Sequence, residues 1–342
     1  MRHRARIYIL YWLFVFLSSC DLAQAADCKP LQILNTVKLE SIDDGKLFLA
    51  PVTINGTPEK FLLDTGGGVT QVAHDISKAL GLREENSIRG TWYDVLGNGS
   101  NKQAALQTFG IGRLTAKNIS IQISPASHLD EGTGAVGLLS TDLFADYDID
   151  LDFGAARLNY FSQDHCEGRV AYWPERPLAI VPFNLEGGHL NLTVTIDGHE
   201  LKAIIDTGAN VTVMSAAIAT KTFGVTPGSI DAPQVGASSY DSLLKYYSHK
   251  FDKLSFAGLE VSNPNILIMT DRVITGANVD KSSLRGALND PYSRARLDPV
   301  TVGMNVLKHL HVYIAYGEKK LYISPAGTGE SVLFKPAAAS AN

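Results

Sequence analysis

Two short stretches decide the fold of this chain: FLLDTGGGVTQV at residues 61–72 and AIIDTGANVTVM at residues 203–214. In each stretch an Asp-Thr-Gly tripeptide directly follows three apolar residues. The two aspartates, Asp64 and Asp206, are 142 positions apart, and the matching residues keep that spacing without a gap. One chain therefore carries the same local arrangement twice.

The sequence before each Asp predicts a β-hairpin. An alternating Val-Thr-Ile strand runs into Asn55-Gly56 in the first copy and into Asp197-Gly198 in the second. Both pairs favour a two-residue type I′ turn. A second apolar strand follows, at residues 61–63 and 203–205. Each Asp is therefore predicted to lie at the end of a buried hairpin strand.

The sequence after each Asp is also repeated. A short helical pattern follows in both copies, HDISKALGL from residue 74 and SAAIATKTFGV from residue 215. Further on, Ala135-Val136-Gly137 and Thr301-Val302-Gly303 each precede an alternating hairpin pattern. The segment between the Asp and this Gly is longer in the second copy. The excess falls largely at residues 270–299.

This duplicated unit resembles the pepsin and retropepsin group of aspartic proteases, and in particular bacterial exported proteins built from two retropepsin-like units. The resemblance covers nearly all of residues 45–325. It implies a mostly β, two-lobed pepsin-like fold made of two duplicated retropepsin-like β units with short helices. The residues that carry it are Asp64-Thr65-Gly66, Asp206-Thr207-Gly208 and the two apolar-apolar-Gly motifs.

The resemblance implies that Asp64 and Asp206 meet at a cleft between the lobes and form a catalytic pair. Two carboxyl groups about 3 Å apart cannot both ionise, so such a pair holds one proton and its two apparent pKa values separate. The ionised member activates water and the protonated member donates to the scissile carbonyl. This chemistry requires neither a metal nor a cofactor, and we expect none.

The family also implies roles for the neighbours of each Asp. Thr65 and Thr207 cross-link the two loops through hydrogen bonds. Gly66 and Gly208 let the backbone amides approach the carboxylates because they have no Cβ. A turn-forming Asp that caps its own backbone is the alternative for either aspartate alone, and the matched contexts favour the catalytic pair.

A cleft of this kind needs a cover that excludes water and holds the peptide as an added strand. In the first copy a Gly-Asn-Gly segment follows Asp64 and predicts the tip of a flap hairpin, or otherwise an ordinary surface turn. In the second copy a Val-Gly pair lies at nearly the same distance from Asp206. The predicted flap and substrate-binding residues are Leu96, Gly97, Asn98, Gly99, Val235 and Gly236.

Two departures from the family pattern bear on activity. Gly67 and Gly68 stand where Ser or Ala usually follows, and they predict a looser first loop. The segment at residues 270–299 carries four arginines, Arg272, Arg285, Arg294 and Arg296. It is either a specificity lid for acidic peptides or, as we favour, a solvated loop.

The first residues have the pattern of a targeting segment. A basic start, an apolar core and Ala23-Gln24-Ala25 predict a secretory signal at residues 1–25. Leu17-Ser18-Ser19-Cys20 also fits a bacterial lipobox, in which Cys20 would be acylated. Both interpretations predict an exported protein, periplasmic or secreted.

Export determines how the cysteines are interpreted. Cys28 and Cys166 are the two thiols left after processing, and an even pair in an oxidising compartment predicts a disulfide. Such a bridge closes a loop of well over a hundred residues, for which the chain-entropy model gives about 4–5 kcal/mol at most.

Composition and the positions of prolines predict the partners and the domain boundaries. The 342 residues carry a net charge of −5 with no basic block, which argues against nucleic acid as a partner. No transmembrane helix follows the signal, and a single chain with two Asp loops predicts a monomer. Prolines mark the junction between the lobes. The predicted plan is a signal at 1–25, an N-terminal lobe at 26–163, a linker at 164–181, a C-terminal lobe at 182–329 and a flexible tail at 330–342.

Two functions fit this sequence. The first is an exported aspartic endopeptidase that acts on peptides or proteins. The second is a peptide-binding protein that keeps the cleft but cleaves slowly or not at all, a hypothesis that Gly67 and Gly68 support. Substitution of either Asp by Asn separates them, because only an enzyme has turnover to lose.

Overall fold

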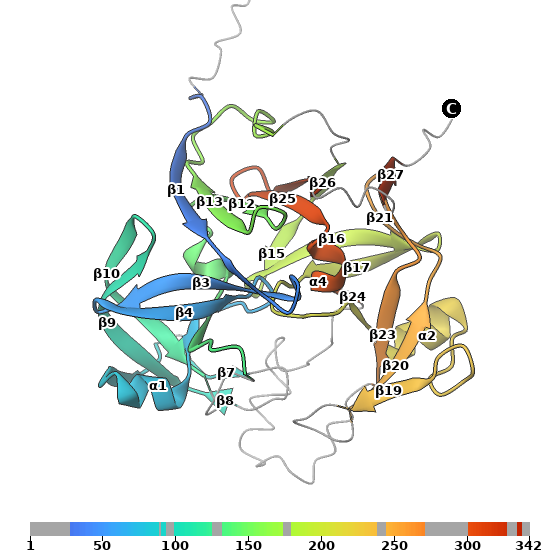
Figure 1. Ribbon diagram of the computed structural model, residues 1–342, viewed down its shortest axis with the longest axis horizontal. Helices are drawn as coiled ribbons and strands as arrows, with labels where there is room; N and C mark the ends of the chain where they lie inside the picture. The colour runs from blue at the N-terminus through green and yellow to red at the C-terminus, as the bar shows by residue number, and fades with distance from the viewer. Residues whose placement is uncertain are drawn as a thin grey trace, which may run out of the picture.

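The computed structural model describes residues 28–88, 90–93, 99–124, 132–173, 179–237, 244–270, 300–326 and 334–336. Within these residues the chain is mostly β, with a few short helices (Figure 1). Three large sheets contain nearly all the strands. One belongs to the first half, one to the second half, and one is shared.

The first half is built on an eight-stranded sheet. In sheet order its strands are β2 (Glu40–Ile42), β3 (Leu47–Ile54), β4 (Thr57–Leu63), β11 (Gly137–Leu139), β5 (Gln71–Val72), β10 (Leu114–Ile123), β9 (Lys102–Ile111) and β6 (Arg83–Asn86). Helix α1 (His74–Ala79), the 3₁₀ helix η1 (Thr141–Leu143) and a small β7–β8 hairpin (Trp92–Tyr93, Gly99–Ser100) complete it.

The second half repeats this plan with additional strands. Its sheet contains β19 (Gln234–Ala237), β20 (Lys245–Lys250), β23 (Asn265–Met269), β18 (Val213–Ser215), β24 (Val300–Val302), β17 (His199–Ile205), β16 (His189–Ile196), β21 (Lys253–Phe256), β22 (Leu259–Ser262) and β27 (Phe334–Pro336), and β15 (Asn184–Glu186) pairs with β16. Its helices are α2 (Ala216–Phe223) and α4 (Met304–Leu307).

The third sheet joins the halves. Its six strands are, in order, β1 (Ile33–Lys38), β13 (Arg157–Phe161), β12 (Asp148–Asp152), β25 (Leu310–Ala315), β26 (Lys320–Pro325) and β14 (Ala179–Pro182). At its centre β12 of the first half pairs antiparallel with β25 of the second, with Ile149 opposite Ile314. The residues of β25 are all buried. The two halves therefore share one continuous sheet (Figure 1), which is buried at β25.

The predicted hairpins are confirmed in both halves. β3 pairs with β4 through Asn55-Gly56, and β16 pairs with β17 through Asp197-Gly198. All four turn residues have positive φ, at 50° and 87° in the first turn and 44° and 85° in the second. This is the backbone of a type I′ turn, which Asn, Asp and Gly adopt at low cost.

The strands that lead to each Asp are buried, as predicted. Phe61 and Leu63 in β4, and Ala203 and Ile205 in β17, are at most 1% exposed. Full burial of a large apolar side chain contributes roughly 1.5–3 kcal/mol. The Asp at the end of each strand is therefore fixed by a packed core on one side.

The structure corrects the match between the two downstream motifs. β11 pairs with β4 so that Gly137 lies opposite Phe61, whereas β24 pairs with β17 so that Val300 lies opposite Ala203. Gly137 therefore corresponds to Val300, and the counterpart of Gly303 is Ser140. The predicted equivalence of Gly137 and Gly303 was wrong, because the first copy has Ser where the motif has Gly. The second half is still the longer one over this segment, but by less than the sequence comparison indicated.

The predicted disulfide is present. Cys28 and Cys166 are bonded with an S–S distance of 1.98 Å and a Cα–Cα distance of 4.7 Å. The bridge ties the first described residue to the end of the first half, and an ion pair between Lys29 and Asp164 at 2.6 Å lies beside it.

The domain boundaries stay predictions, and the structure adds detail to two of them. Strand β14 begins at Ala179, within the predicted linker, and pairs with β26. Strand β27 pairs with β22, so residues 334–336 of the predicted flexible tail are in a strand. The signal at 1–25, the flap residues Leu96, Gly97 and Asn98, and residues 271–299 of the insert lie outside the described residues.

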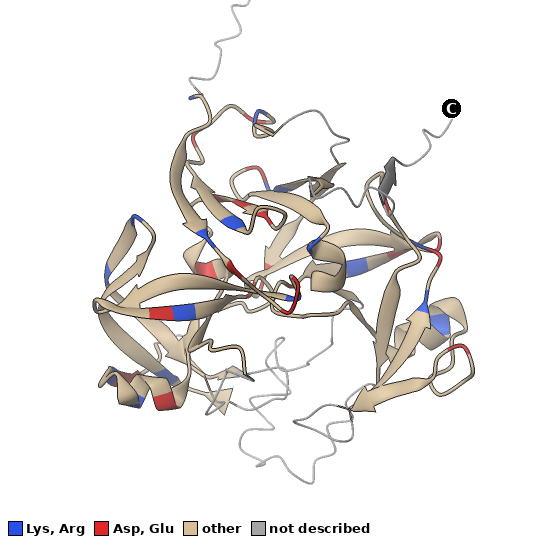
Figure 2. Ribbon diagram, viewed as in Figure 1, with Lys and Arg blue, Asp and Glu red and all other residues tan. Residues whose placement is uncertain are grey.

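The surface charges are mixed. Basic and acidic residues are both scattered over the two halves of the described chain (Figure 2). No helix in the described part of the chain has both the length and the apolar character needed to span a membrane.

Candidate active site

The two Asp-Thr-Gly loops meet, and the threonines bind them together reciprocally. The Thr65 hydroxyl donates to the Ile205 carbonyl at 2.8 Å and accepts from the Thr207 amide at 3.1 Å. The Thr207 hydroxyl donates to the Leu63 carbonyl at 2.7 Å and accepts from the Thr65 amide at 3.0 Å. Both threonines are at most 1% exposed. The cross-link expected of these threonines is thus formed in full.

This arrangement brings the two predicted catalytic carboxyl groups together. Asp64 and Asp206 form a side-chain hydrogen bond with each other, and Asp64 is only 8% exposed. The amide of Gly67 donates to Asp64 Oδ1 at 2.8 Å. The amides of Gly208 and Ala209 donate to Asp206 Oδ1 at 2.8 and 3.1 Å. Backbone donors from each loop therefore fix the orientation of its own carboxyl.

Each carboxyl also packs against the glycine of the opposite loop. A Cβ on Gly66 would lie 2.2 Å from Asp206 Cγ, and a Cβ on Gly208 would lie 2.7 Å from Asp64 Oδ1. Both distances are too short for any side chain. The predicted need for glycine at these positions therefore arises from space, because the other half's carboxyl occupies it.

Burial and mutual charge change the ionisation of the pair. Burial raises the pKa of Asp64 well above its ordinary value, and the negative charge of Asp206 raises it further. Burial also raises the pKa of Asp206. Its backbone donors, the contact with Asp64 and the positive charge of His189 partly offset this rise. The pair therefore retains one proton at a pH where an isolated carboxyl would have lost it, and its apparent pKa values belong to both groups.

A second layer of hydrogen bonds supports each loop in the same way. The Thr70 amide and hydroxyl donate to Asp142 Oδ1 at 2.8 and 2.6 Å, and the Ser140 amide donates to Thr70 Oγ1 at 3.1 Å. In the second half Thr212 makes the same two contacts to Asn305 Oδ1, at 2.7 and 2.8 Å. We did not predict these residues. The repeat could have indicated Thr70 and Thr212, because they stand at matching positions in the two quoted stretches, 142 residues apart.

The first loop is packed rather than loose, contrary to the expectation from its glycines. A Cβ on Gly68 would lie 2.3 Å from the Gly187 carbonyl oxygen, and a Cβ on Gly67 would lie 2.5 Å from Asp64 Oδ2. Gly187 and Gly188 form the turn between β15 and β16, and the Thr141 hydroxyl donates to the Gly188 carbonyl. The second half thus covers Gly68 so closely that only glycine fits there, whereas Gly67 is enclosed by side chains of its own half.

Three of the predicted flap residues, Gly99, Val235 and Gly236, lie in the described chain, on two strand pairs with matching positions. β7 and β8 pair through Tyr93 and Gly99, and β19 pairs with β20. Val235 on β19 is 56% exposed, and no atom of the described residues lies within 4 Å of a Cβ placed on Gly236. Trp92 and Gln234, which begin the two hairpins, keep the same spacing along the chain as the two aspartates. Their role as a cover stays a prediction.

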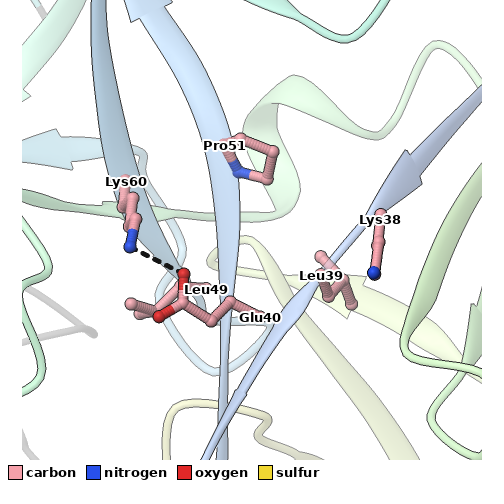
Figure 3. Close-up of a pocket in the computed structure, with 6 residues that line it drawn as sticks. All are labelled: Lys38, Leu39, Glu40, Leu49, Pro51 and Lys60. Carbon is pink, nitrogen blue, oxygen red and sulfur yellow. Dashed lines mark ion pairs between the residues drawn. The ribbon is translucent and has the colours of Figure 1, made fainter.

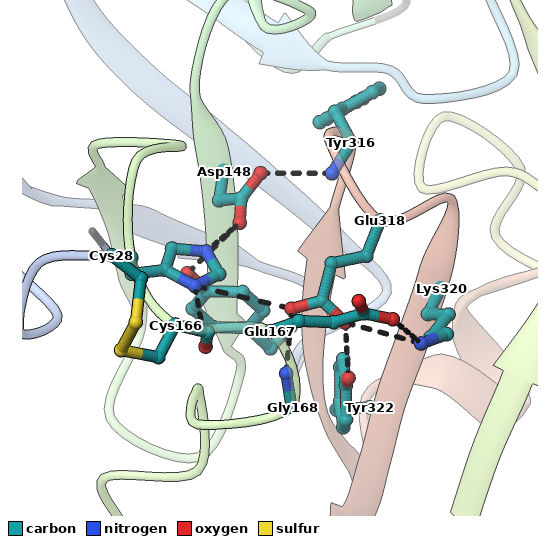
Figure 4. Close-up of polar contacts among 11 residues, drawn as sticks. Cys28, Asp148, Cys166, Glu167, Gly168, Tyr316, Glu318, Lys320 and Tyr322 are labelled. Atoms are coloured by element: carbon teal, nitrogen blue, oxygen red, sulfur yellow. Dashed lines mark hydrogen bonds and ion pairs between the residues drawn. A yellow bond between two sulfur atoms is a disulfide. The ribbon is translucent and has the colours of Figure 1, made fainter. Parts of the chain in front are cut away.

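The shared sheet contains a buried polar cluster that the sequence patterns did not identify. Asp148 Oδ2 lies 2.6 Å from His165 Nε2, and His165 directly precedes Cys166 of the disulfide. The Tyr316 amide donates to Asp148 Oδ1 at 2.9 Å (Figure 4). Burial raises the pKa of Asp148, which His165 only partly offsets. On the same strand, Asp150 Oδ1 makes a hydrogen bond with His311 Nε2. Within the described chain, no hydrogen bond joins either of these pairs to the Asp64 loop or the Asp206 loop.

Two surface hollows occur away from the aspartates in the described chain. One, of about 300 Å³, is lined by Leu39, Leu49 and Pro51 with the Lys60–Glu40 ion pair at its edge (Figure 3). The other, of about 390 Å³, lies at the Asp148–His165 cluster. Neither contains a predicted catalytic or flap residue. Among the described residues, no group of His, Cys, Asp and Glu side chains is arranged to hold a metal ion.

Family models match both halves of the chain. Residues 50–142 match the model described as gag-polyprotein putative aspartyl protease, and residues 192–288 match the model described as aspartyl protease. Each match contains one of the two Asp-Thr-Gly loops. No curated protein sequence matches the chain.

Solved structures are similar to most of the chain or to part of it. The crystal structure of edgp is 9% identical, with a TM-score of 0.51, and the match covers 86% of this chain and 95% of that one. The aspartic proteinase from Irpex lacteus is 12% identical, with a TM-score of 0.49, covering 87% and 99%. A retropepsin-like aspartic protease from Rickettsia conorii is 22% identical, with a TM-score of 0.29, covering 39% and 93%. The two family matches, one in each half, and the likeness to edgp over both halves bear out the predicted pepsin-like fold made of two retropepsin-like units.

Proposed function

We propose that this chain, which belongs to the aspartyl protease family, is an endopeptidase that hydrolyses peptide bonds with water activated on Asp64 and Asp206. The proposed substrate is an extended segment of a peptide or protein. The observation that carries the proposal is the reciprocal threonine cross-link, which holds two hydrogen-bonded carboxyl groups between the halves.

The geometry supports a mechanism of combined acid and base catalysis. The ionised member of the pair accepts a proton from water as the water attacks the scissile carbonyl carbon. The protonated member donates its proton to the carbonyl oxygen, which becomes tetrahedral. The amides of Gly67, Gly208 and Ala209 hold the carboxyl oxygens in place before the reaction, so little reorganisation is needed in the transition state.

The test compares Asp64→Asn and Asp206→Asn with the wild-type chain on a peptide library across a pH series. We expect each variant to lose at least about a thousandfold in turnover, in line with the contribution of acid–base groups. Each variant is expected to remain folded and to bind a statine-type transition-state mimic more weakly than wild type. The matched control is Asp75→Asn on α1, an acidic residue outside the pair, which keeps wild-type turnover.

The peptide-binding alternative gives the opposite outcome in the same experiment. A binder shows no cleavage at any pH and an affinity for peptide that neither Asn substitution changes. The close packing of Gly67 and Gly68 removes the looseness that favoured this alternative. Detectable wild-type hydrolysis that both Asn variants abolish excludes it.

We also propose that the protein acts outside the cytoplasm, as a monomer. The Cys28–Cys166 bridge supports an oxidising compartment, and both aspartates on one chain make a second copy unnecessary. Mass spectrometry of the mature N-terminus separates cleavage before Ala26 from acylation at Cys20. A cytoplasmic protein that retains residues 1–25 contradicts the proposal.

A further inference from the structure

We propose that Ser140 is a positioning residue for Asp64: its hydroxyl donates a hydrogen bond to Asp64 Oδ2 when the pair ionises, and Gly67 leaves the room that this requires. The inference deepens the proposed function and rests on it. Ser140 lies far from Asp64 in the sequence, directly after β11, and the sequence patterns did not identify it.

The Ser140 side chain is not explained by any contact within the described chain. It is fully buried, at 0% exposed, and its hydroxyl has no hydrogen-bond partner among the described residues. Ser140 occupies the N-cap position of η1, where a serine side chain normally accepts a hydrogen bond from the first helical turn, yet it makes no such bond. A buried hydroxyl without a partner lowers the stability of the fold by about 1–3 kcal/mol. The presence of Ser140 at this position therefore requires an explanation.

The hydroxyl of Ser140 and the second oxygen of Asp64 border the same small space. A Cβ built on Gly67 would lie 2.7 Å from Ser140 Oγ and 2.5 Å from Asp64 Oδ2. The other oxygen, Asp64 Oδ1, already accepts from the Gly67 amide. Asp64 Oδ2 is therefore the acceptor that borders the same space as the Ser140 hydroxyl, and the missing side chain of Gly67 leaves that space open.

The second half carries the reverse combination. Ala209 stands at the position of Gly67, and Gly303 at the position of Ser140. A Cβ on Gly303 would lie 2.3 Å from the Val211 carbonyl oxygen and 2.8 Å from the Ala209 carbonyl oxygen, so no side chain fits there. Each half has one side chain and one glycine at this pair of positions, in opposite order. The first half thereby gains a hydroxyl beside its Asp that the second half lacks at this position.

Charged groups from several elements act on Asp64 within the described chain. Asp206 lies against it and raises its pKa, while His189 on β16 acts on the pair through Asp206. Asp142 on η1 accepts two hydrogen bonds from Thr70. Donation by a hydroxyl favours the ionised form of Asp64 and therefore works against burial and Asp206.

The first experiment measures the pH dependence of turnover in the full chain. Ser140→Ala removes the donor, so the ionised form is less favoured and the acid limb of the profile moves to higher pH. The double variant Gly67→Ser with Ser140→Gly provides a hydroxyl from the loop itself and should return the limb toward its wild-type position. Gly67→Ala with Ser140→Gly reproduces the pair found in the second half, has no hydroxyl, and keeps the raised limb.

The second experiment uses folding stability and needs no activity. Gly67→Ala alone should lower the urea midpoint, because the new methyl group meets Ser140 Oγ and Asp64 Oδ2. Adding Ser140→Gly should recover part of that loss. Independent effects of the two changes would contradict the shared space on which the proposal depends.

A direct titration separates this proposal from the proposed function. Carbon-13 NMR of the aspartate carboxyl signals, assigned with Asp64→Asn, gives the apparent pKa values of the pair in wild type and in Ser140→Ala. A higher apparent pKa in Ser140→Ala supports the hydrogen bond even if the chain proves to have no peptidase activity. Identical titration curves overturn it even if the chain is an active protease.

Discussion

The two halves of the molecule agree in the threonine contacts that join them and differ at the pair of positions beside each Asp. Thr65 and Thr207 make the same pair of hydrogen bonds across the junction, at 2.8 and 2.7 Å for the hydroxyl donors and 3.0 and 3.1 Å for the amide donors. Inside each half, by contrast, Gly67 pairs with Ser140 whereas Ala209 pairs with Gly303. The comparison teaches that the reciprocal cross-link requires the same residue in both copies, whereas the two positions beside each Asp can change together within one copy.

The disulfide is the largest difference between the halves, and its removal tests how far the first half depends on it. Cys28 and Cys166 are 138 positions apart, and the described second half has no counterpart. Replacing both by Ser should cost about 4–5 kcal/mol at most, because the denatured chain regains its freedom. Urea unfolding measures this, with dithiothreitol-treated wild type as the control. A loss below about 1 kcal/mol would mean that the denatured state is not constrained by the bridge.

The threonine cross-link should respond equally in both halves. Thr65→Val and Thr207→Val each leave a buried amide and a buried carbonyl without partners, which costs about 2–4 kcal/mol. Thr→Ser at the same positions keeps the hydroxyl and serves as the matched control. Chemical denaturation of all four variants gives the comparison. Clearly unequal losses for the two Val variants would break the symmetry inferred from the bond lengths.

Gly68 and its counterpart Asn210 should respond differently. Gly68→Ala places a methyl group 2.3 Å from the backbone oxygen of Gly187, and such overpacking costs about 1–3 kcal/mol. Asn210 already carries a side chain and is exposed, so Asn210→Ala should change stability by less than about 0.5 kcal/mol. Thermal unfolding of both variants tests this. Equal small effects would show that the β15–β16 turn moves away freely.

His189 should have the smallest effect, a shift in pH dependence. Its positive charge lowers the pKa of Asp206, so His189→Gln lets that pKa rise. The acid limb of the activity profile then moves to higher pH. Leu47 holds the matching position in the first half, and Leu47→Gln is the uncharged control that leaves the limb in place. A shift to lower pH in His189→Gln would contradict the assigned sign.

Much of the fold and of the site could be predicted from local residue chemistry. Asn55-Gly56 and Asp197-Gly198 predict their turns because Asn, Asp and Gly readily adopt the positive φ that a type I′ turn requires. The apolar strands that follow predict that this part of the chain is buried. The Asp-Thr-Gly loops were identifiable because their contexts match in both copies. Thr70 and Thr212 were within reach of the same comparison, because they sit at matching positions in the quoted stretches.

The remainder depends on partners that are distant in sequence. Ser140 was assigned to no role because the expected motif has Gly there, and only the pairing of β11 with β4 shows which residue is equivalent. His165 and His311 could not be paired from the sequence, since their partners Asp148 and Asp150 lie on another strand. The need for glycine at Gly68 has no explanation until the turn at Gly187 is seen against it.

The shared six-stranded sheet has a consequence for how this chain can be divided. β12 and β25 hydrogen-bond to each other at its centre, so either half expressed by itself would present an open strand edge at that line. Such an edge attracts another copy of the same strand. A lone half is therefore expected to self-associate, with two identical Asp loops facing each other, whereas the fused chain can let each loop acquire its own neighbours.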